Sequence, residues 1–124
     1  VAAMRDLTSR PFGVNIAQNL VRDDSVIDIV VDAGVRFVTT SAGDPNRFTA
    51  RLKDAGLTVF HVVPTLRGAQ KAVAAGVDGI FFEVHPEPET ARCDGPNSLY
   101  LAELEELLAA LVKIDRLVKS SIRE

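Results

Sequence analysis

The sequence predicts an α/β protein of four consecutive βα units around a parallel sheet, arranged as half of a (β/α)8 barrel. Two observations lead to this fold class. Apolar, β-branched runs alternate with helical patterns, and a glycine motif typical of helix ends recurs along the chain. The same alternation also fits a rewound Rossmann- or flavodoxin-like sheet that is covered by helices on both faces.

The glycine motif occurs at residues 32–35, 54–57 and 74–77, and each copy is followed by a β-branched or aromatic run. A glycine just after a helix adopts the left-handed conformation that satisfies the last helical carbonyls. Each copy therefore predicts the end of a helix and the start of a strand.

Strands are expected at residues 12–17, 35–40, 57–63 and 79–84. Helices are expected at 24–33, 45–55 and 66–75, begun by Asp23 or Asp24, by Asp44 with Pro45, and by Thr65. A longer helix is expected at 99–119, where leucine, isoleucine and valine recur every three or four residues. Residues 1–7 are interpreted as the tail of a helix that precedes the first strand.

Composition narrows the class of protein. The 124 residues, 47 % hydrophobic and 25 % charged, predict a single domain over 1–124 with its own core. A net charge of −3 with scattered Lys and Arg argues against a nucleic-acid partner. Cys93 is the single cysteine, as expected for a protein of the reducing cytoplasm. Neither a signal peptide nor a membrane span is seen in the sequence, so a soluble protein without membrane partners is expected. A start at Val1 suggests trimming from a longer chain.

A half barrel has helices on one sheet face only. The other face, with Phe12, Phe37 or their neighbours, would lie bare, at a cost of roughly 5–10 kcal/mol for a few hundred Å². The barrel arrangement therefore predicts a homodimer through this exposed sheet face, whereas helices on both faces would give a monomer.

Residues 1 to about 80 contain PFGVN at 11–15, TTSAGDP at 39–45 and VFHVVP at 59–64. This segment resembles the nitronate monooxygenase (2-nitropropane dioxygenase) family of FMN-dependent (β/α)8 barrels. The resemblance implies that Asn15, at a strand end, would lie against a flavin. The catalytic histidine and the phosphate loops of that family have no matching positions here, so FMN is expected only as a remnant of the parent family.

Residues from about 76 to 120 contain IFFEVHPEP at 80–88 and CDGPN at 93–97. They resemble the last βα unit of 3-deoxy-manno-octulosonate 8-phosphate (KDO8P) synthase, a barrel that condenses phosphoenolpyruvate with arabinose 5-phosphate. The resemblance implies that Glu83 and Asp94 are two carboxylate ligands of a divalent metal. The family's other two ligands lie on segments that are absent here, so a metal too is expected only as a remnant.

Two interpretations of Glu83 and Asp94 compete. In the first, the two carboxylates weakly bind a divalent metal or a phosphate ligand, and His85 or Cys93 completes the site. In the second, Glu83 accepts hydrogen bonds from loop amides and Asp94 caps the turn at 94–97. The second is favoured. His61, inside an apolar strand, is interpreted as a buried, satisfied histidine.

The two resemblances meet at AGVDG, residues 75–79, which suggests a splice between residues 1–80 and 81–124. We therefore expect an engineered, de novo chimera of barrel fragments, recombinant in origin. The predicted function is a chimeric scaffold with no evolved catalytic activity. There are two alternatives. The loop with Glu83 and Asp94 weakly binds a metal or phosphate ligand, or the chain is a fragment of an FMN-dependent oxidoreductase.

Overall fold

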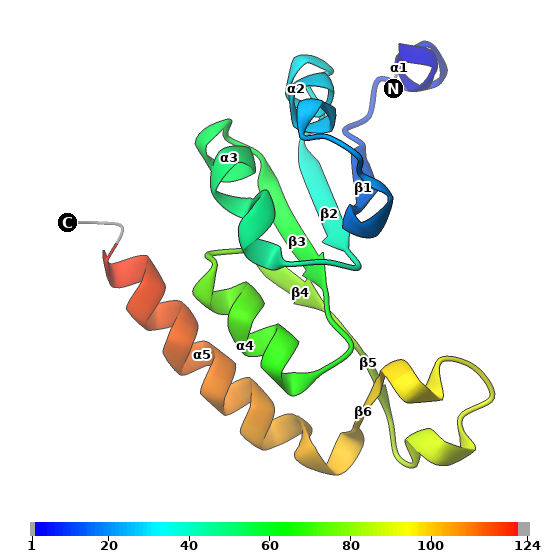
Figure 1. Ribbon diagram of the computed structural model, residues 1–124, viewed down its shortest axis with the longest axis vertical. Helices are drawn as coiled ribbons and strands as arrows, with labels where there is room; N and C mark the ends of the chain where they lie inside the picture. Colours follow the sequence, from blue (N-terminus) through cyan, green and yellow to red (C-terminus); the bar gives the residue numbers. More distant parts are fainter. Residues whose placement is uncertain (1, 122–124) are drawn as a thin grey trace.

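A parallel four-stranded sheet forms the centre of the computed structural model, which describes residues 2–121. Its strands lie in the order β1-β2-β3-β4, the order of the chain (Figure 1). They are β1 (Gly13–Ala17), β2 (Phe37–Ser41), β3 (Thr58–Val62) and β4 (Gly79–Phe81). Because a doubly wound sheet reverses its strand order at a switch point, the sequential order confirms consecutive βα units, and the rewound alternative is wrong.

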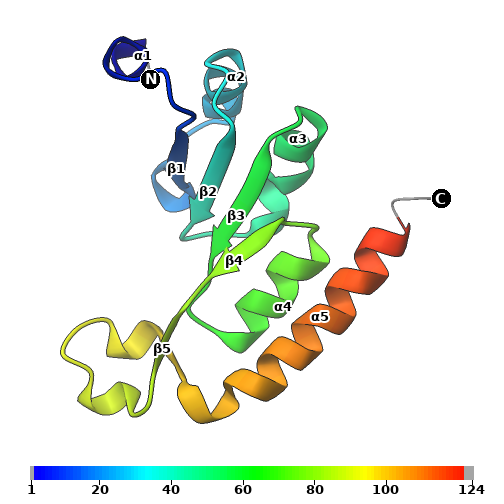
Figure 2. The ribbon, with the colours of Figure 1, turned by 180° about the vertical axis from the view of Figure 1, so that it is seen from behind.

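The helices of the βα units cover one face of this sheet (Figures 1 and 2). They are α2 (Ser25–Asp32), α3 (Thr49–Asp54), α4 (Leu66–Ala74) and α5 (Leu104–Ser121), with α5 packed along α4. A short helix α1 (Ala2–Leu7) precedes β1, as expected for residues 2–7, whereas Val1 lies outside the described residues. None of the helices described is both long and apolar enough to cross a bilayer.

Side chains alternate between the two faces of the sheet. Val38 and Val59 point to the helices and are fully buried. On the opposite face Phe37, Phe60 and Phe81 keep 39 %, 37 % and 56 % of their surface exposed. The predicted bare sheet face is therefore present, and Phe37 and Phe60 partly cover each other there with rings perpendicular and 6.3 Å apart. Phe12 instead packs against the core.

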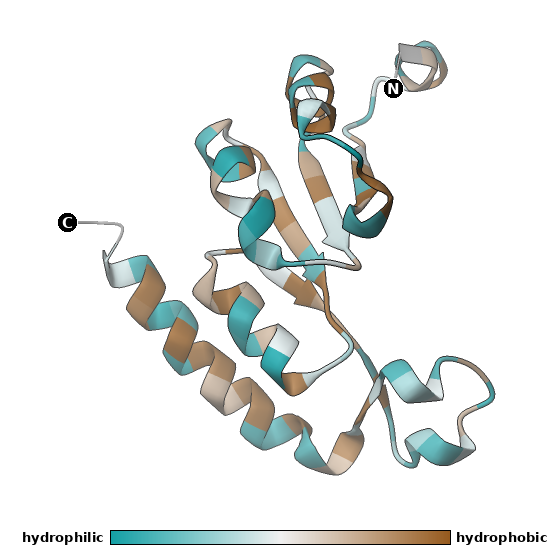
Figure 3. Ribbon diagram, in the orientation of Figure 1, coloured by the Kyte–Doolittle hydropathy of each residue, from teal (hydrophilic) through white to brown (hydrophobic). Residues whose placement is uncertain are grey.

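The hydrophobic core lies between the sheet and the helices. Ile27 of α2 and Leu52 of α3 are completely buried, and Leu107 and Leu111 bring α5 into the same cluster. Figure 3 shows the pattern that makes this possible, with apolar stripes on helices whose other sides are hydrophilic.

The predicted helix boundaries follow from local chemistry. The Asp44 carboxylate accepts a hydrogen bond from the Asn46 amide at 3.0 Å, and the Thr65 hydroxyl accepts one from the Gly68 amide at 3.0 Å. After α4, Gly76 has a φ of 83°, which a side chain would disfavour, and its amide bonds the Val73 carbonyl at 3.0 Å. The glycine motif therefore ends helices as predicted.

The fourth predicted strand, 79–84, is wrong as a single strand. It divides at Phe82, and β5 (Glu83–His85) pairs in parallel with β6 (Ser98–Tyr100) in a separate two-stranded sheet. The last bond to β3 runs from the Val63 amide to the Phe81 carbonyl at 2.9 Å. The next amide of that neighbouring segment that would face β4 belongs to Thr65, which already caps α4, so the ladder ends there.

The predicted helices at 45–55 and 99–119 also differ from the structure. The first divides at Phe48 into a 3₁₀ turn and α3, and the second begins only at Leu104 because residues 98–100 form β6. The leucines that continued the helical pattern at 99 and 101 belong to β6 and a following 3₁₀ turn. Periodicity alone does not separate these elements.

Candidate functional site

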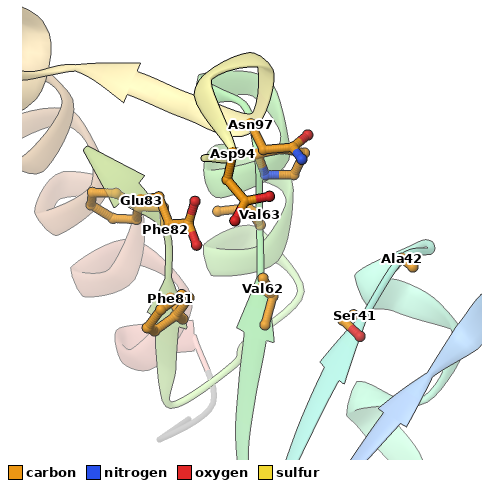
Figure 4. Close-up of a pocket in the computed structure, with 10 residues that line it drawn as sticks. Ser41, Ala42, Val62, Val63, Phe81, Phe82, Glu83, Asp94 and Asn97 are labelled. Atoms are coloured by element: carbon orange, nitrogen blue, oxygen red, sulfur yellow. The ribbon is translucent and has the colours of Figure 1, made fainter. Parts of the chain in front are cut away.

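A cleft of about 410 Å³ lies at the carboxyl ends of β2, β3 and β4, where ligand sites of parallel sheets collect. Its walls come from the strand ends and from the long loop between β5 and β6 (Figure 4). The lining residues are Ser41, Ala42, Val62, Val63, Pro64, Phe81, Phe82, Glu83, Asp94 and Asn97.

Glu83 and Asp94 line this same cleft, and their carboxylates point toward one another in Figure 4. Glu83 is the first residue of β5, immediately after the break at Phe82. Asp94 has a left-handed backbone with a φ of 51°. Its carbonyl accepts bonds from the Asn97 amide at 2.9 Å and the Ser98 hydroxyl at 3.1 Å. The turn is therefore held through the backbone of Asp94.

The interpretation in which these carboxylates only stabilise the loop is wrong for Asp94. Its side chain makes no capping bond at the turn that follows it. Within residues 2–121, the Glu83 carboxylate likewise accepts no bond from a loop amide. Both carboxylates are therefore left available in the cleft.

The donor chemistry of the cleft fits a divalent cation. Carboxylate oxygens and the Asn97 side chain are hard ligands of the type that such ions take. The lining contains no Lys, Arg or His, so a phosphate group would meet two like charges without a basic partner. The cleft thus suits a cation better than a phosphate.

Neither residue expected to complete a metal site reaches the cleft. The His85 Nδ1 atom accepts a bond from the Glu87 amide at 3.0 Å, and Cys93 is exposed to solvent. No group of three or more His, Cys, Asp or Glu side chains near enough for one metal occurs in the described part of the chain. The pair Glu83 and Asp94 is therefore an incomplete set of ligands.

Asn15 lies apart from this cleft. It is exposed on β1, where it is in register with Thr39 of β2, on the face that the helices leave bare. The structure therefore does not bring Asn15 together with Glu83 and Asp94 within one chain.

His61 is buried, as expected, on the helix-covered face of β3 and retains 3 % of its surface exposed. Its Nδ1 atom lies 2.7 Å from the Thr40 hydroxyl. Burial lowers the pKa of His61 from 6.5, against the opposing effects of a hydrogen bond to the Gly43 backbone and of the Asp44 charge. Gly43 belongs to the loop that follows Ser41 and Ala42 of the cleft wall.

The lowered pKa of His61 predicts an acid-sensitive fold. The unfolded chain takes up the proton near the ordinary value of 6.5 and the folded chain only at lower pH, so stability is retained above pH 6.5 and is lost as pH falls below it. We expect a slope of up to about 1.4 kcal/mol per pH unit from this group. Urea titrations at several pH values measure it, with His61→Gln as the control that removes the slope. An equal slope in that variant contradicts the assignment.

Two residues of the cleft and one buried polar residue outside its lining were not predicted. Ser41, the last residue of β2, and Asn97, in the 3₁₀ turn after Asp94, line the cleft; they lie in the motifs at 39–45 and 93–97, but neither was predicted as a site residue. Gln18 is buried with both side-chain polar atoms unpaired among the described residues, and it packs against Gly43. Its position in a polar segment, Gln18–Leu20, indicates a surface turn instead.

The carboxyl-terminal half of the chain is similar to known enzymes. Residues 60–120 match the model of the DAHP synthetase I family. The 2-dehydro-3-deoxyphosphooctonate aldolase of Pelobacter propionicus is 65 % identical over 51 residues, covering 41 % of this chain and 19 % of the aldolase. The Fusobacterium nucleatum aldolase is 52 % identical over 59 residues, covering 48 % and 20 %. The chain spans about a fifth of the length of these curated relatives.

The remainder of the chain resembles a second group of proteins. The structure of FabK from Thermotoga maritima superimposes with a TM-score of 0.60 at 32 % identity, covering 64 % of this chain and 25 % of FabK. Its M276A mutant matches equally well and is covered over 27 %. The parallel order of four strands is consistent with part of the barrel found in these neighbours.

These similarities correct the predicted function. A scaffold without evolved catalytic activity is the wrong interpretation, because identity of up to 65 % to a 2-dehydro-3-deoxyphosphooctonate aldolase points to a catalytic segment. The likeness to KDO8P synthase, predicted from residues 80–97, is supported by these relatives.

Proposed function

We propose that residues 60–121 act as the catalytic carboxyl-terminal segment of a site of the 2-dehydro-3-deoxyphosphooctonate aldolase type, in which Glu83 and Asp94 bind a divalent cation. One observation carries the proposal: the two carboxylates line one cleft at the carboxyl ends of the strands, within the segment most similar to the aldolases. The substrate would be a phosphorylated sugar acid of that class.

The chain's own side chains would divide the work. Glu83 and Asp94 would hold the cation, and Asn97, which lines the same cleft, would offer an amide oxygen or N–H to orient a ligand. A divalent cation held there would polarise the carbonyl oxygen beside which an aldolase makes or breaks a carbon–carbon bond. With two ligands from the protein, such a cation would keep coordination positions for substrate or water.

The walls of the cleft would favour this chemistry. Val62, Phe81 and Phe82 form an apolar surface beside the carboxylates, and a drier site strengthens the interaction between cation and substrate oxygen. Since the lining has no basic side chain, the phosphate of the substrate would have to be held outside this cleft.

Titration calorimetry with Mn²⁺ and Zn²⁺ on the metal-stripped chain tests the proposal. We expect saturable binding of one ion, weakened at least tenfold by Glu83→Gln or by Asp94→Asn, because each change removes a charged ligand and keeps its shape. Glu87→Gln is the matched control, since Glu87 lies in the same loop and outside the cleft lining.

The outcomes separate the possibilities clearly. Binding that is equal in all three variants assigns the ion to another part of the chain, and an absence of saturable binding removes the metal role of the pair; either result overturns the proposal.

Three earlier expectations stay predictions: Asn15 as a flavin contact, a single domain over 1–124 and an engineered origin of the chain. Yellow colour in the purified protein would indicate the flavin.

A further inference from the structure

Both edges of the four-stranded sheet are open. Within residues 2–121, β1 pairs only with β2 and β4 only with β3, so each edge strand has one unpaired side. Edge strands are usually protected by charged residues or by proline. The sequences of these strands, GVNIA in β1 and GIF in β4, contain neither.

The last helix, which packs along α4 at the end of the helix layer, leaves an apolar stripe exposed (Figure 1). Leu108 and Val112 of α5 are 44 % and 47 % exposed. Since successive residues differ by 100° around a helix, they lie about 100° from the buried Leu107 and Leu111. They also point away from Glu106 and Ala110, which line a groove shared with α4. The stripe therefore faces the side of α5 that has no neighbour.

The bare face adds a third unpartnered surface. An aromatic side chain buries about 150–250 Å², so the exposed parts of Phe37, Phe60 and Phe81 offer roughly 200–330 Å² per copy. A stable interface needs about 800 Å² from each partner. The phenylalanines supply about a third of that area, and the strand edges and the α5 stripe are available for the rest.

We propose that a second copy of this chain occupies all three surfaces at once. The β4 edge of each copy pairs in parallel with the β1 edge of the other, so that eight parallel strands close into a ring. The phenylalanines then fill the interior of the ring, and the α5 stripe covers the new junction between strands. Two identical contacts related by a twofold axis close this assembly, so it stops at the dimer.

The ring also brings Asn15 of one copy close to the carboxylate pair of the other. In one chain Asn15 and the carboxylate pair lie at opposite edges of the sheet, β1 and the end of β4. Pairing of β4 with β1 of the second copy makes these strands neighbours, with their carboxyl ends at the same end of the ring. Asn15 of the second copy then faces the interior next to Phe81.

Light scattering and sedimentation velocity on the full chain test this proposal. We expect a mass of twice 13.4 kDa for the wild type. Leu108→Lys and Phe60→Lys should each raise the dissociation constant at least tenfold, because a charge would be buried in the junction or in the interior. Leu117→Lys is the matched control. It is a leucine of the same helix, 69 % exposed and nine residues away, hence on the opposite side.

Other outcomes overturn the ring. A wild-type protein that stays monomeric at all concentrations contradicts the ring. A dimer that Phe60→Lys disrupts and Leu108→Lys leaves intact also contradicts it, since that pattern is expected for two sheets packed face to face. A mass that keeps growing with concentration indicates an open head-to-tail chain. Far-UV circular dichroism checks that each variant is folded, and Val112→Lys provides a second substitution of the stripe.

Discussion

Replacing Phe48 by alanine should lower the free energy of unfolding by about 3–5 kcal/mol. Phe48 lies at the break between the 3₁₀ turn at Pro45–Arg47 and α3, and only 1 % of its surface is exposed. The Arg47 guanidinium also lies 4.6 Å from the centre of its ring. Removing the ring leaves a cavity and takes away this cation–π contact.

Urea unfolding followed by circular dichroism measures this loss. Leu52→Ala and Leu117→Ala form a matched pair of controls, because the first leucine is completely buried and the second is 69 % exposed. We expect about 2–5 kcal/mol for the first and less than about 0.5 kcal/mol for the second. If Phe48→Ala costs no more than Leu117→Ala, the assignment of Phe48 to the core is wrong.

Gly95→Ala should destabilise the loop that carries Asp94 and weaken metal binding. A Cβ at this position would overlap the backbone carbonyl oxygen of Pro88, and a backbone atom cannot move aside as a side chain can. Overpacking of this kind costs about 1–3 kcal/mol. Asp94 is the preceding residue, so a displaced loop also carries its carboxylate away from Glu83.

Calorimetric titration with Mn²⁺ beside thermal unfolding measures both effects of Gly95→Ala. Gly68→Ala is the control, because Gly68 lies in α4, outside the cleft lining, and the nearest atoms to a Cβ there belong to side chains, the Thr65 hydroxyl at 3.1 Å and Val63, instead of a backbone carbonyl. The expected result is weaker binding in the first variant and unchanged binding in the second. Full metal affinity in Gly95→Ala contradicts the role of this loop in placing Asp94.

The fold could be predicted from the sequence where one local signal decides the structure. The glycine at 76 and the threonine at 65 mark the two ends of α4 because each satisfies backbone groups of that helix. The division of the fourth strand could not be predicted this way. It depends on where the neighbouring segment leaves the sheet to begin α4 at Thr65, and the hydrophobic pattern of residues 79–84 is the same with or without that neighbour.

Only part of the candidate site could be predicted, because the rest depends on backbone conformation and on neighbouring segments. Glu83 and Asp94 were found through family resemblance, and the structure places both on one cleft. Whether their carboxylates were engaged in bonds to the loop depended on the backbone conformation of Asp94, which sequence does not reveal. Ser41 reaches the same cleft only because β2 and β4 end at the same side of the sheet.

The buried core residues and the carboxylates proposed to do chemistry lie in different stretches of the chain. No fully buried hydrophobic residue lies between Val77 and Leu107 in the described chain, and Glu83, Asp94 and Asn97 all fall in that interval. Most positions of the β5–β6 lobe, apart from Leu99 and Gly95, could therefore change without loss of the packing that keeps the chain folded. Such a division makes the lobe the part of the molecule in which a new specificity can evolve most freely.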